Sequence, residues 1–249
     1  MKAYRVHEYG DAAKFIEDEV NKPSAKQGHV VVKVKASSLN PIDHKLLKSD
    51  LGINPALPGI LHMDVAGVIT EVGEGVTAFK TGDEIYGCAG GLQGEAGNIE
   101  GALADFMLAD SNLIALKPKS LSFSESAALP LVTITAWEGL FDRAHIKKED
   151  HVLIHGGTGG VGHIAIQLAR QHGARVATTV SSEDKAKVAR GLGAEDIIFY
   201  RDEKVEDYTQ RLTKGKGFDA VFDTIGADNL DKSLEAAKVS GQVISIIGS

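Results

Sequence analysis

The sequence predicts a two-part fold: a β-rich first half followed by a doubly wound α/β domain. From His151 onward, apolar runs such as "HVLIH", "ARVATTV" and "FDAVFDTIG" alternate with stretches of helical period. This alternation is typical of parallel β-α-β units. Before residue 120, short valine-rich runs are instead separated by glycine-containing turns, as in antiparallel sheets. A chain of 249 residues is long enough for one large domain or two ordinary ones.

The composition is typical of a soluble globular protein. Hydrophobic residues make up 43% and charged residues 24% of the chain, which favours a packed core over disorder. The net charge of -7 comes from interspersed acidic and basic residues, so neither nucleic acid nor membrane is predicted as a partner. No apolar run reaches the roughly 18 residues of a membrane span, and the N-terminus is too polar for a secretory signal. With Cys88 as the single cysteine, we expect no internal disulfide and a cytoplasmic location.

In the first half, alternation and glycine predict the elements. "HVVVKVKAS" predicts a strand, "DVAGVITEVGEGV" a pair of strands, and "FKTGDEIYG" a turn followed by a strand. Residues 87–101 are glycine-rich without periodicity and are predicted as loop, and "ALADFMLADSNLIALKP" returns to strand character. Ser122 and Glu125 have the capping-box spacing, which predicts a helix that begins there and continues past Trp137.

In the second half, strands and helices are predicted in alternation. The strands are "HVLIH", "ARVATTV", "DIIFY", "FDAVFDTIG" and "QVISIIGS". The helices between them cover 160–172, "EDKAKVARGLG", a charged segment after residue 200, and "NLDKSLEAAKVSG". In the first of these helices, four apolar residues at helical spacing predict the stripe that faces the sheet. They are Val161, Ile164, Ala165 and Leu168.

A glycine motif follows the first strand of this region. Gly157, Gly159 and Gly162 have the spacing Gly-x-Gly-x-x-Gly between a strand and a helix, the context that dinucleotide-binding loops require. The first glycine allows a tight turn, the second lets backbone approach a pyrophosphate, and the third lets helix and strand pack closely. The helix N-terminus also favours an anion. The predicted loop residues of this dinucleotide site are Gly157, Thr158, Gly159, Gly160 and Val161.

The end of the second strand predicts which dinucleotide binds. An acidic residue there would bond the ribose 2′-hydroxyl of NAD, but "ARVATTV" is followed by Ser181 and Ser182. Lys185 lies one helical turn later, and Tyr200 ends the next strand. A hydroxyl, an ammonium and a phenol suit a 2′-phosphate, which a carboxylate would repel. We therefore predict NADPH, held by Ser181, Lys185 and Tyr200; the alternative for Lys185 is an ordinary solvated lysine.

Several segments together resemble one known family. They are "SSLNPIDHKLLK", "HMDVAGVITEVGEGVTAFKTGDEIYG", "GALADFMLADSNLIALKP", "AALPLVTITAWEGL", "VLIHGGTGGVGHIAIQLA" and "FDAVFDTIG", in this order. Over nearly its whole length the chain resembles medium-chain dehydrogenases/reductases of the zinc-free quinone oxidoreductase, or zeta-crystallin-like, group. The resemblance implies a GroES-like β-barrel domain at 1–124 and a Rossmann NADPH-binding domain at 125–249, with the active site in the cleft between them.

The resemblance also implies that no zinc is bound. Zinc-dependent relatives use a Cys, a His in a Gly-His-Glu motif and a further Cys, and Asn40, Met63 and about Leu131 stand at those positions. His62 and Asp64 supply two possible ligands, but a zinc site needs at least three from the protein. The cysteine cluster of the structural zinc is missing as well. The alternative that stays open is a zinc alcohol dehydrogenase with displaced ligands.

The expected reaction without zinc is hydride transfer from NADPH to an electrophilic carbon of a quinone or an α,β-unsaturated carbonyl. The resemblance places Asn40 and Lys45 at the nicotinamide and the substrate carbonyl, where an amide or ammonium donor would stabilise the developing oxyanion. Asp43 either orients neighbouring backbone, the interpretation we favour, or transfers protons. The resemblance adds four further cofactor contacts: Thr135, Thr224, Ile247 and Gly248.

The C-terminus departs from the family. Its members continue for some tens of residues beyond "VISIIGS" and add a sixth strand, usually the dimer edge, whereas this chain ends at Ser249. We therefore expect a truncated Rossmann domain and, in a full-length form, a homodimer. A non-enzymatic NADPH-binding protein is a further alternative. A methyltransferase is less well supported, because its glycine loop usually comes with an acidic strand end.

Overall fold

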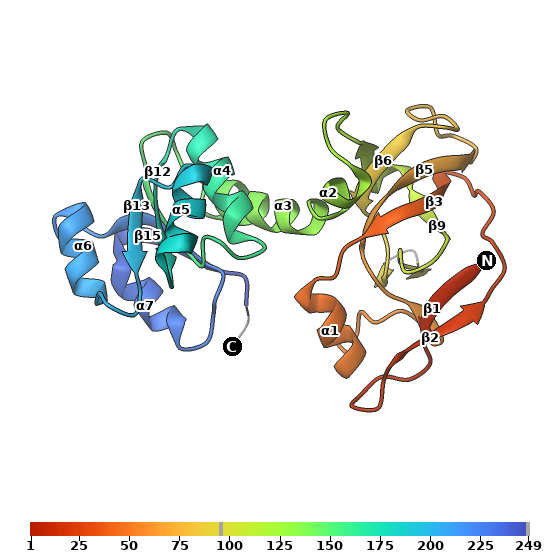
Figure 1. Cartoon of the computed structure of the whole chain (residues 1–249), viewed down its shortest axis with the longest axis horizontal. Coiled ribbons are helices and arrows are strands. Elements are labelled where there is room, and N and C mark those ends of the chain that lie inside the picture. The colour runs from red at the N-terminus through yellow and green to blue at the C-terminus, as the bar shows by residue number, and fades with distance from the viewer. Residues whose placement is uncertain (95–96, 248–249) are drawn as a thin grey trace. The chain divides into compact units, whose positions relative to one another are not determined.

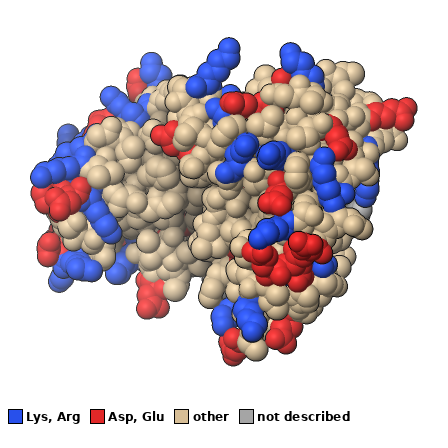
Figure 2. All heavy atoms as spheres, turned by 45° about the vertical axis from the view of Figure 1, so that its right-hand side comes forward, with Lys and Arg blue, Asp and Glu red and all other residues tan. Residues whose placement is uncertain are grey.

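The computed structural model describes residues 1–94 and 97–247 (Figure 1). The chain divides into two compact units, Met1–Leu131 and Val132–Ser249. Basic and acidic side chains are interspersed on the face that Figure 2 shows. Among the described residues, the helices are all too short or too polar to cross a membrane.

The first unit consists mainly of antiparallel strands. They are β1 (Lys2–Val6), β2 (Phe15–Glu19), β3 (His29–Ser37), β4 (Gly59–Ile60), β5 (Asp64–Val72), β6 (Glu84–Cys88), β7 (Leu92–Gly94), β8 (Gly97–Ile99), β9 (Phe106–Asp110) and β10 (Ile114–Leu116). Hydrogen bonds join them into sheets of order β2-β1-β4, β10-β6-β5-β3-β9 and β7-β8. Val30, Val32, Val65 and Ile85 of the five-stranded sheet are fully buried in one core cluster. The valine-rich runs therefore form strands because their side chains fill this core.

Two α-helices and a short 3₁₀ turn, η1 (Ser111–Leu113), complete the first unit. They are α1 (Pro41–Lys48) and α2 (Phe123–Ala127). The predicted capping box of α2 is confirmed, because the Glu125 N–H donates to Ser122 Oγ at 3.2 Å and the Ser122 N–H donates to Glu125 Oε2 at 2.8 Å. Helix α2 packs on β3, β5 and β6. The domain boundary expected after residue 124 thus falls within a helix that packs on the first unit.

The second unit is a parallel sheet with helices on both faces. Its elements, from the helix that crosses the boundary onward, are α3 (Pro130–Trp137), the π-helical segment η2 (Glu138–Arg143), β11 (His151–His155), α4 (Gly162–His172), β12 (Arg175–Val180), α5 (Glu183–Leu192), β13 (Asp196–Phe199), α6 (Val205–Thr213), β14 (Phe218–Asp223), α7 (Asn229–Ala236) and β15 (Ala237–Ser245). The strand order is β13-β12-β11-β14-β15, and every pairing is parallel. This confirms the doubly wound α/β prediction.

The two faces of this sheet are covered by different helices. Leu153, Ile198 and Val221 lie in one buried cluster with Tyr208 of α6 and Ala236 of α7. Because side chains alternate along a strand, the intervening residues of β11 and β12 face the other way, where α4 and α5 pack. The carboxyl ends of the strands, where the glycine motif begins, lie at one edge of this sandwich.

Two predictions for the first half are wrong. The segment 64–76 forms one strand, β5, followed by a turn in which the Val76 N–H donates to the Gly73 carbonyl at 3.4 Å. A Cβ at Gly73 would lie 1.7 Å from the Lys26 carbonyl oxygen. Residues 87–101, predicted as loop, contain the β7–β8 hairpin, in which Leu92 pairs with Ile99. Such pairing depends on a partner strand and leaves no periodic signal.

Two predictions for the second half are also corrected. The helix expected over 229–241 ends at Ala236, and strand β15 begins at Ala237. Ala237 pairs with Phe218 of β14, and the register shifts before Gln242 pairs with Ala220. Ser240, with a φ of 64°, lies in this irregular part of β15. Val161, just before α4, and Leu168 within it are only half-buried. The buried stripe is turned by one residue because Gly162 packs against the preceding loop. The buried residues of α4 are Gly162, Ile164, Ala165, Ile166 and Ala169.

Candidate functional site

The glycine loop connects β11 to α4 at the carboxyl ends of the strands. A Cβ at Gly157 would lie 2.0 Å from Thr178 Oγ1, and a Cβ at Gly162 would lie 2.2 Å from the Gly156 carbonyl oxygen. Neither position accepts a side chain, as the tight turn and close packing of the predicted motif require. In the sheet β11 stands between β12 and β14. The loop therefore lies at the topological switch point, where doubly wound sheets bind ligands.

Backbone donors in this loop are free to bind an anion. The Gly159 N–H donates to the Gly156 carbonyl at 2.8 Å, and the His163 N–H donates to the Gly159 carbonyl at 3.1 Å. Within the part of the chain that the structure describes, the N–H groups of Gly160 and Val161 have no acceptor. Two unused donors at the start of a helix, together with glycines that a Cβ would crowd, fit the pyrophosphate of a dinucleotide.

The ends of β12 and β13 carry the side chains predicted to hold a 2′-phosphate. Val180 pairs with Phe199, so Ser181 and Tyr200 directly follow two paired strand ends. Ser181 is half-buried, and Tyr200 is 49% exposed. Sequence reasoning missed Arg201, whose guanidinium carbon lies 5.6 Å from the centroid of the Tyr200 ring. Its position next to Tyr200 was the available signal, and it adds a cation to this edge.

At the start of α5, some polar side chains are already bonded within the protein and one is free. Ser182 caps the helix, with its Oγ accepting the Lys185 N–H at 3.4 Å. The Lys185 side chain is exposed and, among the described residues, has no ion-pair partner. Glu183, in contrast, pairs with Arg190 at 2.8 Å. The cation at this strand end is thus available to a ligand, while the neighbouring carboxylate is partly neutralised.

The remaining predicted cofactor residues lie on other elements. Thr135 is half-buried on α3. Thr224 follows β14, and its hydroxyl donates to the His155 carbonyl at 2.7 Å. Ile247 is 36% exposed, and a Cβ at Gly226 would contact its side chain. Gly248 lies outside the described residues.

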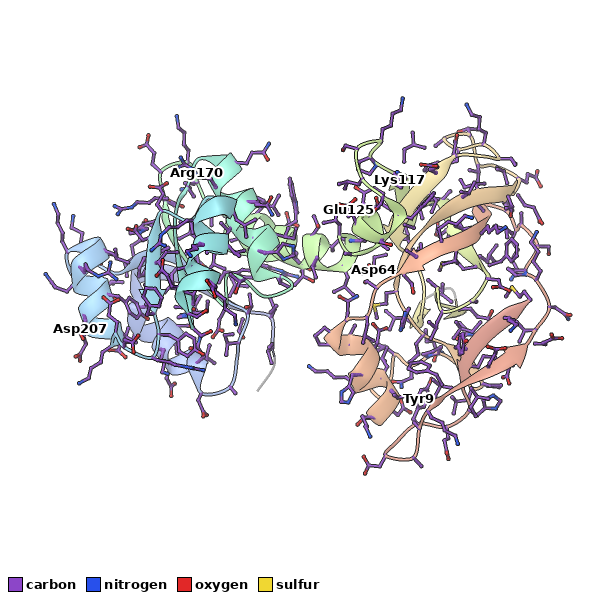
Figure 3. All side chains as sticks on the ribbon, viewed as in Figure 1. Tyr9, Asp64, Lys117, Glu125, Arg170 and Asp207 are labelled. Atoms are coloured by element: carbon purple, nitrogen blue, oxygen red, sulfur yellow. The ribbon has the colours of Figure 1, made fainter. Side chains whose placement is uncertain are left out.

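A buried polar cluster in the first unit surrounds Asp64, which Figure 3 labels. Asp64 is fully buried at the start of β5. Its Oδ2 accepts Ser38 Oγ at 2.6 Å and Asn40 Nδ2 at 2.9 Å, and its Oδ1 accepts the Leu131 N–H at 2.9 Å. Burial raises the pKa of Asp64, and the hydrogen bonds from Ser38 and Asn40 oppose that rise. Sequence reasoning considered Asp64 only as a metal ligand and missed its role as an acceptor for three donors from two chain segments, 38–40 and Leu131.

Both amide hydrogens of Asn40 are used within this cluster. Asn40 Nδ2 donates to Asp64 Oδ2 at 2.9 Å and to Ser38 Oγ at 3.1 Å. Turning the amide over would place Asn40 Oδ1 against the carboxylate, so the orientation is set by charge. The amide-donor role expected for Asn40 is therefore not available in this arrangement. Lys45, exposed on α1, keeps a free ammonium among the described residues.

The Asp43 carboxylate accepts backbone N–H groups from two chain segments. It is 1% exposed and accepts the Asn40 N–H at 2.7 Å and the His62 N–H at 3.2 Å. Burial raises the pKa of Asp43, and its bonds to these N–H groups work in the opposite direction. His62 has a φ of 72°, and burial lowers its pKa. Asp43 thus holds the turn at His62 in a conformation that non-glycine residues rarely adopt.

The residues at this cluster do not fit a zinc ion. Over residues 1–94 and 97–247, no three His, Cys, Asp or Glu side chains gather as a metal-binding group. Burial, with the nearby Asp64 charge, raises the pKa of the Cys88 thiol to about 12. The Asp64 oxygens are already occupied by donors.

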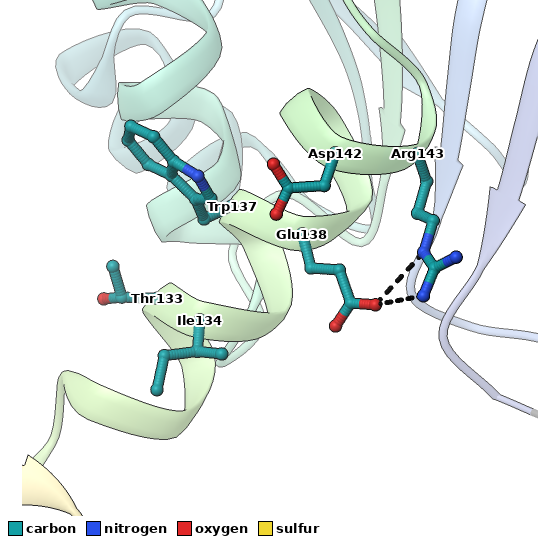
Figure 4. A pocket seen from close by; sticks show the side chains of 6 residues that line it. All are labelled: Thr133, Ile134, Trp137, Glu138, Asp142 and Arg143. Atoms are coloured by element: carbon teal, nitrogen blue, oxygen red, sulfur yellow. Dashed lines mark hydrogen bonds and ion pairs between the residues drawn. The ribbon is translucent and has the colours of Figure 1, made fainter. Parts of the chain in front are cut away.

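A separate hollow of about 500 Å³ lies over α3 and η2 (Figure 4). Its lining includes the exposed Trp137 and the carboxylates of Glu138 and Asp142. Arg143 donates to Glu138 Oε1 from Nε at 3.1 Å and from Nη2 at 2.7 Å. None of the predicted site residues lines this hollow. The second carboxylate of the hollow, that of Asp142, would repel phosphate. We therefore do not assign the hollow to the dinucleotide.

Known proteins share both halves of this architecture. Residues 26–119 match the family "Alcohol dehydrogenase GroES-like domain", and residues 160–248 match "Zinc-binding dehydrogenase". An Arabidopsis thaliana NADPH-dependent alkenal/one oxidoreductase, chloroplastic, is 36% identical over the whole chain, which spans 63% of that protein. The quinone oxidoreductase of Pongo abelii is 32% identical, again over the whole chain and 73% of the relative.

A solved structure agrees with these relatives. The crystal structure of an alcohol dehydrogenase superfamily protein from Novosphingobium aromaticivorans is 40% identical, with a TM-score of 0.91 over 100% of this chain and 73% of that one. The chain belongs to the medium-chain dehydrogenase/reductase superfamily, among the relatives of the quinone oxidoreductases. The predicted GroES-like and Rossmann fold classes are thereby confirmed.

Proposed function

We propose that this protein is an NADPH-dependent oxidoreductase that transfers hydride to a quinone or an α,β-unsaturated carbonyl. The observation that carries the proposal is the glycine loop, whose free N–H groups stand at the switch point of the sheet. The neighbouring strand ends offer Ser181, Lys185 and Tyr200, and Ser181 stands where an NAD-binding site would have an acid. The names of the relatives, an NADPH-dependent alkenal/one oxidoreductase and a quinone oxidoreductase, support the same cofactor and substrate class.

Each part of the site has a separate task in this proposal. The N–H groups of Gly160 and Val161 bind the pyrophosphate, and Lys185 neutralises the 2′-phosphate. Bound NADPH supplies the hydride. The Lys45 ammonium donates a hydrogen bond to the substrate carbonyl oxygen as negative charge develops there, a role that typically contributes about 3 kcal/mol. Asn40, whose amide hydrogens are bound within the cluster, offers a ligand only its Oδ1 acceptor, and Asp43 holds the backbone.

The finer assignments stay proposals of the same kind. They comprise cofactor contacts from Thr135, Thr224, Ile247 and Gly248, a homodimeric full-length form, and a cytoplasmic location. The absence of a fitting zinc ligand set among the described residues supports a reaction that starts from an already electrophilic carbon.

The test is a fluorescence titration of the 249-residue chain with NADPH and, in parallel, with NADH. We expect tighter binding of NADPH. Lys185→Ala should weaken NADPH binding roughly 10- to 100-fold, because a hydrogen bond to a charged group is worth ~1.5–3 kcal/mol, and should leave NADH binding unchanged. Lys187→Ala is the matched control, since Lys187 is an exposed lysine of the same helix whose ammonium lies 3.9 Å from Asp184.

Turnover then tests the substrate class. Purified protein with NADPH should reduce quinones or enones and leave saturated ketones unchanged. Equal affinity for the two cofactors would remove the 2′-phosphate assignment. NADPH binding without turnover of any quinone or enone would favour the non-enzymatic alternative.

A further inference from the structure

Three threonine hydroxyls hold consecutive backbone groups where β11 passes into the glycine loop. Thr178 Oγ1 donates to the Ile154 carbonyl at 2.6 Å, and Thr224 Oγ1 donates to the His155 carbonyl at 2.7 Å. Thr179 Oγ1 accepts the next N–H along the chain, that of residue 156, at 3.0 Å. We call these three residues the threonine clamp. Each of its hydroxyls bonds a different backbone group of residues 154–156.

The clamp reaches the loop from both neighbouring strands. Thr178 and Thr179 lie near the end of β12, and Thr224 directly follows β14. Thr178 is fully buried and Thr179 is 6% exposed, so these two hydroxyls lie beneath the loop surface. Thr178 Oγ1 also fills the space that a side chain at Gly157 would need, because a Cβ there would lie 2.0 Å away. The first glycine of the motif is thus packed directly against the clamp.

The Thr179 hydroxyl also lies beside a buried histidine. Thr179 Oγ1 accepts a backbone N–H at 3.0 Å and lies 3.4 Å from His155 Nδ1. The His155 imidazole is 3% exposed, and burial lowers its pKa to about 4. The ring is therefore neutral near pH 7 and adds no charge beneath the loop.

We propose that the threonine clamp consists of positioning residues for the pyrophosphate of NADPH. By fixing residues 154–156, it sets the path of the loop so that the free N–H groups of Gly160 and Val161 are in place before the ligand arrives. Preorganisation of this kind strengthens binding by removing the entropy loss of ordering the loop. The inference rests on the proposed function, because the anion at the loop is taken to belong to NADPH.

The experiment compares two ligands on single variants of the full chain. Thr178→Val and Thr179→Val remove a hydroxyl and nearly keep the side-chain shape, and neither residue is among the proposed direct cofactor contacts. Each should weaken NADPH binding about 3- to 10-fold, the effect of one hydrogen bond. Adenosine 2′-monophosphate has the 2′-phosphate without the pyrophosphate, so its dissociation constant should stay within about twofold of the unmodified protein.

Matched variants separate positioning from general stability. Thr209→Val makes the same change at a buried threonine of the same unit whose hydroxyl has no partner within residues 1–94 and 97–247, and it should leave both dissociation constants unchanged. Thr178→Ser and Thr179→Ser retain the oxygen and should restore NADPH affinity. Thermal unfolding of each variant confirms that the protein titrated is folded, and the Ser variants keep the test valid should a Val variant fail to fold.

The outcomes are distinct. NADPH binding by Thr178→Val and Thr179→Val equal to that of the unmodified chain would overturn the proposal. So would equal weakening of both ligands, which would mean that the threonines support the fold as a whole. Failure of the unmodified chain to bind either ligand would instead count against the proposed function.

Discussion

A methyl group at Gly157 should destabilise the second unit without changing any charge. A Cβ there would lie 2.0 Å from Thr178 Oγ1 and 2.8 Å from Ile166 Cδ1, and both neighbours are fully buried. The closer contact must lengthen by about 1 Å to reach the 3.0 Å that real Cβ atoms keep. Overpacking costs about 1–3 kcal/mol and loss of the Thr178 hydrogen bond about 1 kcal/mol more, so Gly157→Ala should lower the unfolding free energy by roughly 2–4 kcal/mol.

Urea unfolding followed by the fluorescence of Trp137 measures this loss, because the only tryptophan of the chain lies in the second unit. Gly160→Ala is the control in the same loop, where the nearest atom to a Cβ is Val132 Cγ1 at 3.7 Å. It should be neutral or stabilising by up to about 1 kcal/mol. Thr178→Ala should recover part of the loss in the Gly157→Ala background, since the two changes share one contact. Equal urea midpoints for the two alanine variants would refute the reasoning.

Three further predictions concern buried groups. The pKa of His155 falls from 6.5 to about 4 on burial, so as the pH is lowered the unfolded chain takes up a proton at this histidine before the folded protein does. The unfolding free energy should therefore drop by about 3 kcal/mol as the pH falls from 6.5 to 4. His155→Asn should show a smaller drop over that range. The Cys88 thiol, with a pKa of about 12, should resist iodoacetamide at pH 8 in the folded protein and react in urea; equal rates would contradict its burial. Asp64→Ala leaves buried donors without an acceptor and should lower the unfolding free energy by ~3 kcal/mol or more. The control is Asp11→Ala, at an exposed carboxylate 3.4 Å from Lys48, which should change the unfolding free energy by no more than about 0.5 kcal/mol.

Much of the second unit could be predicted because its signals are local. Alternating strands and helices, and glycines between a strand and a helix, each depend on neighbours in the chain, as does the capping box at Ser122 and Glu125 in the first unit. The corrected elements depend on distant partners. The β7–β8 hairpin exists through cross-strand pairing, and the buried stripe of α4 is turned because Gly162 packs on the backbone of Gly156.

The candidate site also has one part that could be predicted from the sequence and one part that could not. By itself, the sequence determined the class of fold and the place of the glycine loop, because motif spacing is a property of the chain, and it predicted Ser181, Lys185 and Tyr200 as cofactor residues from the ends of the strands. Only the tertiary structure decided that Asp64 binds both Ser38 and Asn40. It also decided which polar groups are buried and which remain free to bind a ligand. Those facts arise when segments far apart in the sequence meet in a dry interior, where each donor must find an acceptor.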